Sequence, residues 1–275
     1  MRIESTDTTV TAYVRQSWIN DALMCAERGR QAIVRPEWSL PNDATILGTA
    51  VHAGIAASLV GAGESTKVAK DELDRLLQEP FQRVKYENEE LYEFSTALCR
   101  KWEKEIAPTL GDVMFVEKEF EFLLDEYDDP VIGKRVYLWG KGTIDCVTKT
   151  AVWDWKTAAR KYSPKDKQSQ AVQPTMYAAA SVAEGWHEYP VWFKYGVMIR
   201  GGSAQVVSIH RNESHADWLR EQVRPLVRTA CLVGTDYSWV KNDTHYLCSA
   251  TWCSWWSICK GSKLSPEDIT PKEQA

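Results

Sequence analysis

The chain has 275 residues, of which 44% are hydrophobic and 26% charged, and its net charge at pH 7 is −5. These values are ordinary for a globular protein, and no apolar run of about 18 residues predicts a membrane span. The acidic balance argues against a protein coated in nucleic acid but allows a local basic groove. Without an apolar leader at the N-terminus, we expect a cytoplasmic protein whose seven cysteines do not form disulfides.

Apolar residues recur at helical spacing through the first hundred residues. Asn42 or Asp43 offers a cap for a helix that ends near Gly61, and Pro108 stops the last helix of this part. We therefore predict helices over about 17–30, 43–61, from 65 onward and 89–106.

The pattern changes to period two near Val113, which is typical of strands. Strands are predicted over about 113–124, 135–147, 151–157, 191–199 and 205–209, with helices over 163–185 and 217–233. The order helix, three strands, helix, strand predicts a mixed α/β core. We expect one domain over 1–275: a mainly helical part (1–110), a core (111–210), a helix with a cysteine cluster (211–261) and a polar tail (262–275).

The stretch from Gly142 to Lys156 places two acids and a lysine on a predicted β-hairpin. Asp154 and Lys156 are two residues apart, so their side chains leave the same face of a strand. A turn at 148–150 can bring Asp145 opposite them. Two carboxylates beside an ammonium group suit a hard divalent cation and the hydrolysis of a phosphodiester.

These residues, together with others in the same order, resemble the PD-(D/E)XK nuclease superfamily. The resemblance is to its RecB-like branch, which includes Cas4 and the AddB nuclease domain, and it covers roughly residues 15–261. It implies a restriction-endonuclease-like fold, a mixed β-sheet core (αβββαβ) flanked by helices. The matching motifs are an upstream histidine, G-x-x-D, D-x-K-T and Q-x-x-x-Y, here His52, Gly142–Asp145, Asp154–Thr157 and Gln173–Tyr177.

The resemblance implies a site for Mg²⁺ or Mn²⁺, with His52, Asp145, Asp154 and the main-chain carbonyl of Trp155 as metal ligands. Lys156 would then position or activate the attacking water, while Gln173 and Tyr177 orient the nucleic acid or the lysine. Glu117 and Glu119 on the preceding strand could add a ligand, but we interpret them as a solvated strand face. Pro174 follows Gln173 directly, so the helix either is kinked there or starts anew.

A basic cluster follows the catalytic strand: Arg160, Lys161, Lys165 and Lys167. These side chains could bind the phosphate backbone of DNA, or they could simply belong to a solvated loop before a helix.

Three cysteines near the C-terminus, Cys248, Cys253 and Cys259, are interleaved with bulky aromatic residues, and Cys25 would complete a set of four thiolates. In the Cas4-like and AddB-like nucleases this distribution implies a [4Fe–4S] cluster. A zinc site fits the same ligands, and unligated thiols are a further alternative.

We therefore expect a metal-dependent DNA exonuclease that acts on single-stranded DNA or duplex ends in recombination, repair or processing, with other DNA-processing proteins as further partners. The alternatives are a nuclease-fold accessory subunit of a DNA-processing or integration complex and a structure-specific endonuclease.

Overall fold

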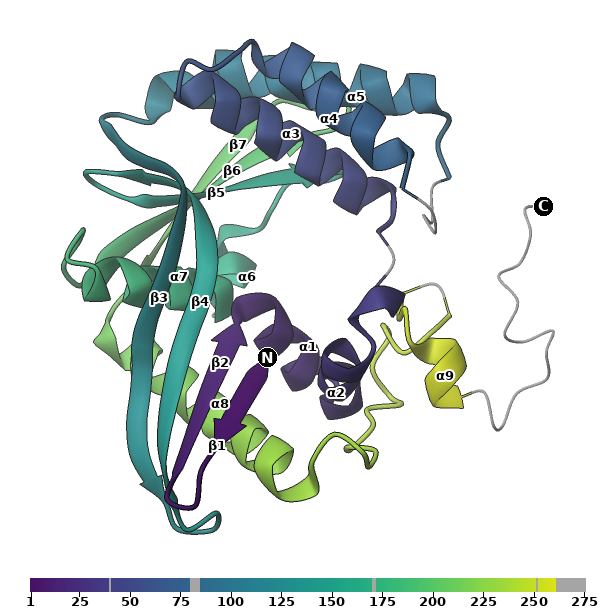
Figure 1. Ribbon diagram of the computed structural model, residues 1–275. Helices are drawn as coiled ribbons and strands as arrows, with labels where there is room; N and C mark the ends of the chain where they lie inside the picture. Colours follow the sequence, from purple (N-terminus) through teal and green to yellow (C-terminus); the bar gives the residue numbers. More distant parts are fainter. Residues whose placement is uncertain (40, 80–84, 170–171, 251, 261–275) are drawn as a thin grey trace.

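The computed structural model of the protein describes residues 1–39, 41–79, 85–169, 172–250 and 252–260. Its centre is a mixed seven-stranded sheet in the order β1-β2-β4-β5-β6-β7, in which β3 also pairs with β4 (Figure 1). The strands are β1 (Arg2–Ser5), β2 (Thr9–Arg15), β3 (Val113–Asp129), β4 (Lys134–Thr148), β5 (Val152–Ala158), β6 (Val191–Ile199) and β7 (Gln205–Arg211).

Helices cover the sheet from both sides (Figure 1). They are α1 (Gln16–Met24), α2 (Ala26–Val34), α3 (Asp43–Leu59), α4 (Ser65–Leu77), α5 (Asn88–Lys101), α6 (Pro164–Ser169), α7 (Val172–Ala183), α8 (Glu213–Val233) and α9 (Trp256–Lys260). Single turns of other helix types lie at Pro36–Trp38, Trp102–Ile106 and Ala107–Thr109. The predicted mixed sheet flanked by helices is confirmed, because α5, β3, β4, β5, α7 and β6 follow one another in the expected order.

Two local predictions are corrected. We expected no strand before Val113, yet β1 and β2 form a hairpin whose second strand pairs in parallel with β4. The helix predicted over 17–30 is two helices, because Cys25 has an extended backbone with a φ of −158°. The predicted tail, 262–275, lies outside the described residues. Within the described part, no helix has the length and apolar character needed to cross a bilayer.

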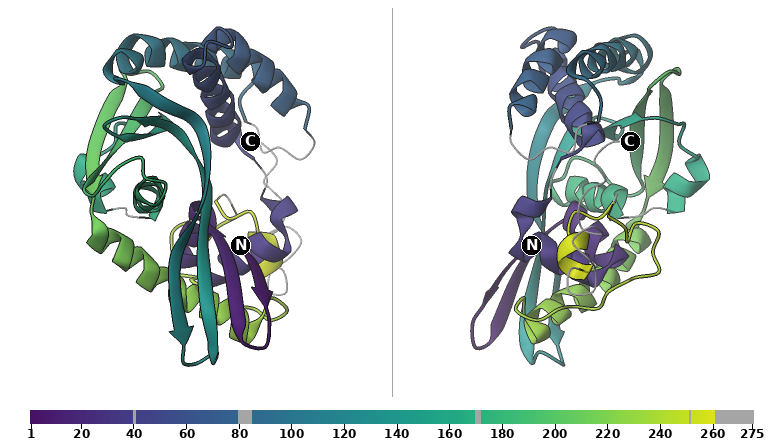
Figure 2. Two further views of the ribbon diagram at one scale, coloured as in Figure 1. Left: turned by 60° about the vertical axis from the view of Figure 1, so that its left-hand side comes forward. Right: turned by 90° about the vertical axis from the view of Figure 1, so that its right-hand side faces the viewer.

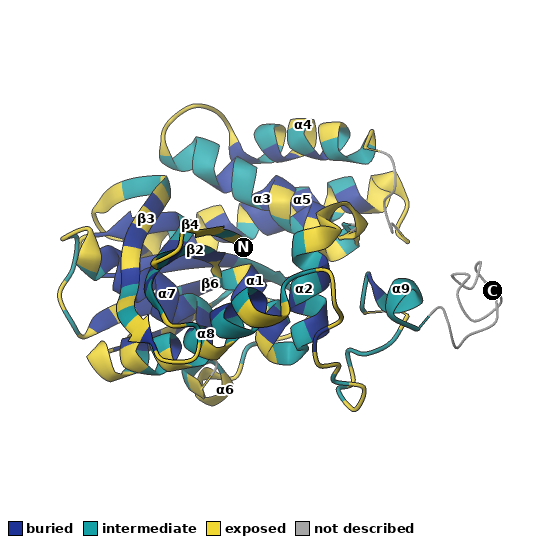
Figure 3. Cartoon of the chain, turned by 60° about the horizontal axis from the view of Figure 1, so that its bottom comes forward, coloured by how far each residue is buried: buried dark blue, intermediate teal, exposed yellow. Residues whose placement is uncertain are grey.

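The side chains of β5 divide between two hydrophobic clusters, as the alternation of a strand requires. Val152 packs in the cluster shared with α1, α7 and α8, whereas Trp153 and Trp155 pack in the cluster shared with α3 and α5. Burial is concentrated where sheet and helices meet, and α6 stays exposed (Figure 3). Asp154 and Lys156 therefore share the α7 side of the sheet with Val152.

The long β3–β4 hairpin extends alongside α8 (Figure 2). Arg224 and Arg228 are one turn apart on α8, and their guanidinium groups lie 2.7 and 2.9 Å from the carboxylates of Asp125 and Asp129. These ion pairs fix the hairpin against the helix.

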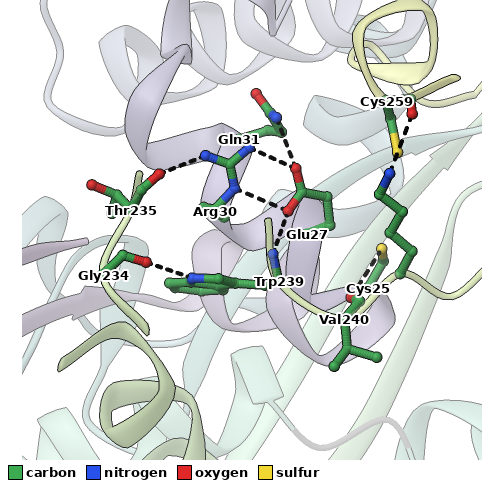
Figure 4. A network of polar contacts seen from close by, with 10 residues as sticks. Cys25, Glu27, Arg30, Gln31, Gly234, Thr235, Trp239, Val240 and Cys259 are labelled. Carbon is green, nitrogen blue, oxygen red and sulfur yellow. Dashed lines mark hydrogen bonds and ion pairs between the residues drawn. The ribbon is translucent and has the colours of Figure 1, made fainter. Parts of the chain in front are cut away.

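Glu27 of α2 joins the N-terminal helices to the chain after α8 (Figure 4). Its carboxylate accepts hydrogen bonds from Arg30, Gln31 and the backbone N–H of Trp239, the last at 2.7 Å. This network brings Cys25 beside the C-terminal segment, where its Sγ accepts a bond from the backbone N–H of Asn242 at 3.4 Å.

Candidate active site

The segment Gly142–Asp145 lies on a part of β4 that lacks a strand along one edge. Strand β3 occupies the other edge along nearly the whole length of β4. On the open edge, β2 pairs with 135–141 and β5 pairs only with Cys146 and Val147. Among the described strands, β2 and β5 therefore leave residues 142–145 uncovered between them, where polar groups remain available for a site.

Asp145 is directed into this opening by a distortion of the neighbouring strand. Glu117, opposite Asp145 in β3, has a left-handed backbone with a φ of 47°, which is uncommon for a residue other than glycine. Alternation also breaks in β4, because Ile144 and Cys146 are two residues apart yet join different clusters. The two strands bend together at this point.

Where β4 and β5 are not paired through their backbones, the side chain of Asp145 hydrogen-bonds the backbone of β5 instead. Its Oδ2 accepts a hydrogen bond from the backbone N–H of Trp155 at 2.7 Å. The Nε2 of His52, from α3, lies 2.8 Å from the carbonyl oxygen of Trp155. Because a carbonyl only accepts, this nitrogen carries a proton, and Nδ1 faces Asp145 Oδ2 at 3.5 Å. The carbonyl of Trp155, which the resemblance implied as a metal ligand, is here the acceptor for Nε2, and an ion bound at Nδ1 would lie on the other side of the imidazole ring.

Asp154 is buried, and its two oxygens have different partners. Gln173 Nε2 donates to Oδ1 at 2.7 Å, and Lys156 Nζ lies 2.6 Å from Oδ2. Gln173 and Pro174 lie at the start of the described part of α7 (Val172–Ala183). The junction between α6 and α7, residues 170–171, lies outside the described residues.

Tyr177 lies one turn after Gln173 but packs into the core. Its ring contacts those of Phe120 and Phe193, with centroids 5.7 and 6.2 Å apart. Gly142 permits this packing, since a Cβ there would lie 2.7 Å from the ring of Phe120. Tyr177 thus packs in the core and anchors the turn of α7 that carries Gln173.

The structure adds Glu117 to the residues that could bind a metal. Ligand atoms of His52, Glu117 and Asp145 all lie within 4.8 Å of one another. We had interpreted Glu117 as part of a solvated strand face. The sequence offered only its place on the preceding strand as a signal, because the left-handed backbone is not readable from residue types.

The electrostatics of the site show a surplus of negative charge, buried at Asp145 and Asp154 and exposed at Glu117. Burial raises the pKa of Asp154 to about 6, although Lys156 opposes the shift. Protein packed around the carboxyl of Glu117, followed by repulsion from Asp145, raises its pKa to about 7. Burial also acts to raise the pKa of Asp145, but charge and hydrogen bonding from His52 outweigh it and hold that pKa below its usual value. Such a donor set fits a divalent cation.

The predicted DNA-binding residues fall into two environments. Arg160, Lys161 and Lys165 are exposed in the loop and helix that follow β5. Lys167 is half-buried, with Nζ 4.1 Å from the ring centroid of Tyr162, and burial lowers its pKa. Lys167 therefore sits closer to the protein interior than the other three.

All four cysteines expected to bind a cluster line one cavity, together with Arg28 and Lys241. None of them forms a disulfide, and Figure 4 shows Cys25 and Cys259 in the same region. Burial raises the pKa of Cys253 and of Cys259, and nearby cations, among them Arg28 and Lys241 respectively, act against it. The net shift favours the protonated thiols, so a bound metal would have to supply the charge that holds them as thiolates.

The chain was compared with known proteins. Residues 26–260 match the model of the PD-(D/E)XK nuclease superfamily, while a search of curated proteins gave no match. A solved structure of a candidate exonuclease from Eubacterium rectale is similar in fold, with a TM-score of 0.57 and 11% sequence identity, covering 94% of this chain and 91% of that one. The family match spans most of the sequence and includes the site described above, so the chain belongs to the PD-(D/E)XK nuclease superfamily.

Proposed function

We propose that the protein is a metal-dependent DNA exonuclease of the RecB-like, Cas4-like branch, acting in DNA recombination, repair or processing. The observation that carries this proposal is the grouping of carboxylates, an imidazole and a lysine at the uncovered edge of β4. The candidate exonuclease from Eubacterium rectale, which has a similar fold, supports the exonuclease activity.

Mg²⁺ or Mn²⁺ would be held by His52 through Nδ1 and by the carboxylates of Asp145 and Glu117, with Asp154 next to them. A bound divalent ion supplies charge that neutralises phosphoryl oxygens and lowers the pKa of water. His52 is oriented for this role, since its other nitrogen donates to a carbonyl, as metal-binding histidines commonly do.

Lys156 acts as a cation in this proposal. Burial lowers its pKa, but the charges of Asp154 and Asp145 outweigh burial and hold it above its usual value. The ammonium group therefore stays protonated at neutral pH and donates to a phosphoryl oxygen or to the attacking water. Gln173 fixes Asp154 from the other side, so the carboxylate and the ammonium group keep their relative positions.

Digestion of end-labelled single- and double-stranded DNA with Mn²⁺ tests the activity. We expect Asp154→Ala and Lys156→Ala to lower the rate by about 100-fold or more. Lys149→Ala, in the exposed β4–β5 turn, is the matched control and should cleave like the wild type. Cutting of closed circular DNA would instead indicate an endonuclease, and an inert wild-type protein would leave an accessory role.

We further propose that Cys25, Cys248, Cys253 and Cys259 hold a [4Fe–4S] cluster that ties the two ends of the chain together. Around tetrahedral zinc, sulfurs are about 3.8 Å apart. Among the described residues, the ligand atoms of His52, Glu117 and Asp145 lie within 4.8 Å of one another, and the sulfurs of the four cysteines form no group of this kind. The four cysteines do line one cavity, and in a [4Fe–4S] cluster each of them would bind a different iron.

Anaerobic purification followed by metal analysis tests the cluster. The protein should be brown, with iron and acid-labile sulfide that are lost in Cys253→Ala and retained in Cys231→Ala, a cysteine outside the cavity. A colourless protein with one equivalent of zinc would replace the cluster with a zinc site.

A further inference from the structure

Arg200 lies at the end of β6 and is held in place by two aromatic rings of the α5 region. Its Cζ is 5.5 Å from the ring centroids of both Tyr86 and Phe94, and Nη1 donates to the hydroxyl of Tyr86 at 3.3 Å. The two rings meet edge to face, with centroids 5.3 Å apart. Because the two rings already restrict the side-chain conformations of Arg200, binding a ligand costs this side chain less conformational entropy.

The position of Arg200 relates it to the catalytic strand. Strands β5 and β6 are parallel, and the backbone N–H of Arg200 donates to the carbonyl of Ala158 at 2.9 Å. Ala158 lies two residues beyond Lys156, about 7 Å along the strand. The side chain of Arg200 lies on the α3 and α5 side of the sheet, with Met198 and Phe94. This is the side of α3, the helix of His52, and it is opposite the side to which Asp154 and Lys156 point.

Within the described part of the chain, Arg200 has no ion-pair partner. No carboxylate of the described residues lies within 4.0 Å of its guanidinium. Nearby acids are engaged elsewhere: Asp43 accepts bonds from the backbone N–H groups of Lys85 and Tyr86, and Glu87 forms the capping box of α5. A bound phosphate can therefore take the open side of the guanidinium, which matches phosphate geometry.

We propose that Arg200 binds a backbone phosphate of the DNA strand on the α3 and α5 side of the sheet and so positions the strand beyond the C-terminal end of β5. The inference rests on the proposed nuclease function and adds a contact that the sequence analysis did not assign. Arg160 comes two residues after β5 (Val152–Ala158), and Arg200 comes directly after β6 (Val191–Ile199), the parallel neighbour of β5. Together they extend the basic surface from the loop after β5 to β6.

The test is equilibrium binding of a fluorescently labelled oligothymidylate at several salt concentrations in EDTA, combined with steady-state cleavage in Mn²⁺. Arg200→Gln removes the charge, and Arg200→Met removes it while keeping an unbranched side chain on the two rings. Arg200→Lys keeps the charge. Arg2→Gln is the matched control, because Arg2 also stacks on a tyrosine, Tyr13 at 4.3 Å, but on the edge strand β1.

We expect Arg200→Gln and Arg200→Met to reduce the slope of log affinity against log salt by about 0.7, which is about fivefold weaker binding at 0.1 M salt. KM should rise with kcat nearly unchanged, while Arg200→Lys and Arg2→Gln keep the wild-type slope. Unchanged slope and KM in both neutral variants would overturn the inference and leave Arg200 as packing for α5. A wild-type protein that neither binds nor cleaves DNA would refute the nuclease function itself, and this inference with it.

Discussion

Glu117 has a backbone conformation that costs about 1–3 kcal/mol for a residue other than glycine. Such strain persists when surrounding structure compensates for it, and here it lies directly opposite Asp145. The distortion brings a third side chain that could bind a metal toward His52 and Asp145, while Asp154 stays engaged with Gln173 and Lys156. At the residue scale, backbone geometry decides which of two nearby glutamates can reach a metal.

Glu117→Gln should therefore reduce Mn²⁺-dependent cleavage, because the loss of one carboxylate weakens metal binding by about tenfold to a hundredfold. Glu119→Gln is the matched control, since Glu119 is two residues away on the same strand and exposed. Cleavage rates over a Mn²⁺ titration measure both variants. Equal effects in the two would show that Glu117 acts only through its general negative charge.

At the scale of elements, α3 positions His52 through contacts on two sides. Its C-terminal half crosses α4, where a Cβ on Gly54 would lie 2.3 Å from the carbonyl oxygen of Ser65. Nearer its start, a Cβ on Gly48 would meet only the hydroxyl of Thr157, at 3.6 Å. Glycine is therefore needed at position 54, where two helices are in close contact, and can be replaced by alanine at position 48.

Gly48→Ala should raise the free energy of unfolding by about 0.5–1 kcal/mol, because alanine favours a helix more than glycine does. Gly54→Ala should lower it by about 1–3 kcal/mol, because the backbone of α4 must move. Denaturant unfolding measures both changes. A stabilised Gly54→Ala protein would mean that α3 and α4 are free to separate.

The pairs between α8 and the β3–β4 hairpin are a second interaction at this scale. Asp129 is 1% exposed, and burial acts to raise its pKa, but hydrogen bonds from the backbone N–H of Ile132 and from Arg228 hold the pKa below its usual value. Arg135, in contrast, pairs on the surface with Glu126 and Asp128.

Arg228→Met should lower the free energy of unfolding by about 2 kcal/mol, because it leaves a buried carboxylate without its cation. Arg135→Met should leave stability almost unchanged, since exposed pairs contribute little. Thermal unfolding of the two variants compares them directly, and similar losses in both would contradict the assignment.

At the scale of the whole molecule, Glu27 holds the N-terminal helix α2 against the chain that follows α8. Burial acts to raise the pKa of Glu27, but hydrogen bonds from Arg30, Gln31 and Trp239 outweigh it and place the pKa below its usual value of 4.5. The unfolded chain thus binds a proton at Glu27 at a higher pH than the folded chain does. The stability that Glu27 contributes is complete above pH 4.5 and is lost as pH falls through its folded pKa.

Glu27→Gln should consequently reduce the acid sensitivity of unfolding, with a lower stability at neutral pH and a flatter decline below pH 4.5. Urea unfolding across this range checks the expectation. Glu37→Gln, on an exposed glutamate of the following turn, is the control and should keep the wild-type pH dependence.

The sequence alone determined the residue types of the site, because metal and phosphate chemistry restricts them to a few kinds at short spacings. His52, Asp145, Asp154 and Lys156 could be named for this reason, and the periodicity of the core predicted its strands and helices. Only the tertiary structure decided the rest. The parallel pairing of β2 with β4, the bend at Glu117 and the rings around Arg200 depend on contacts between segments far apart in the chain. Residue spacing carries no record of such contacts.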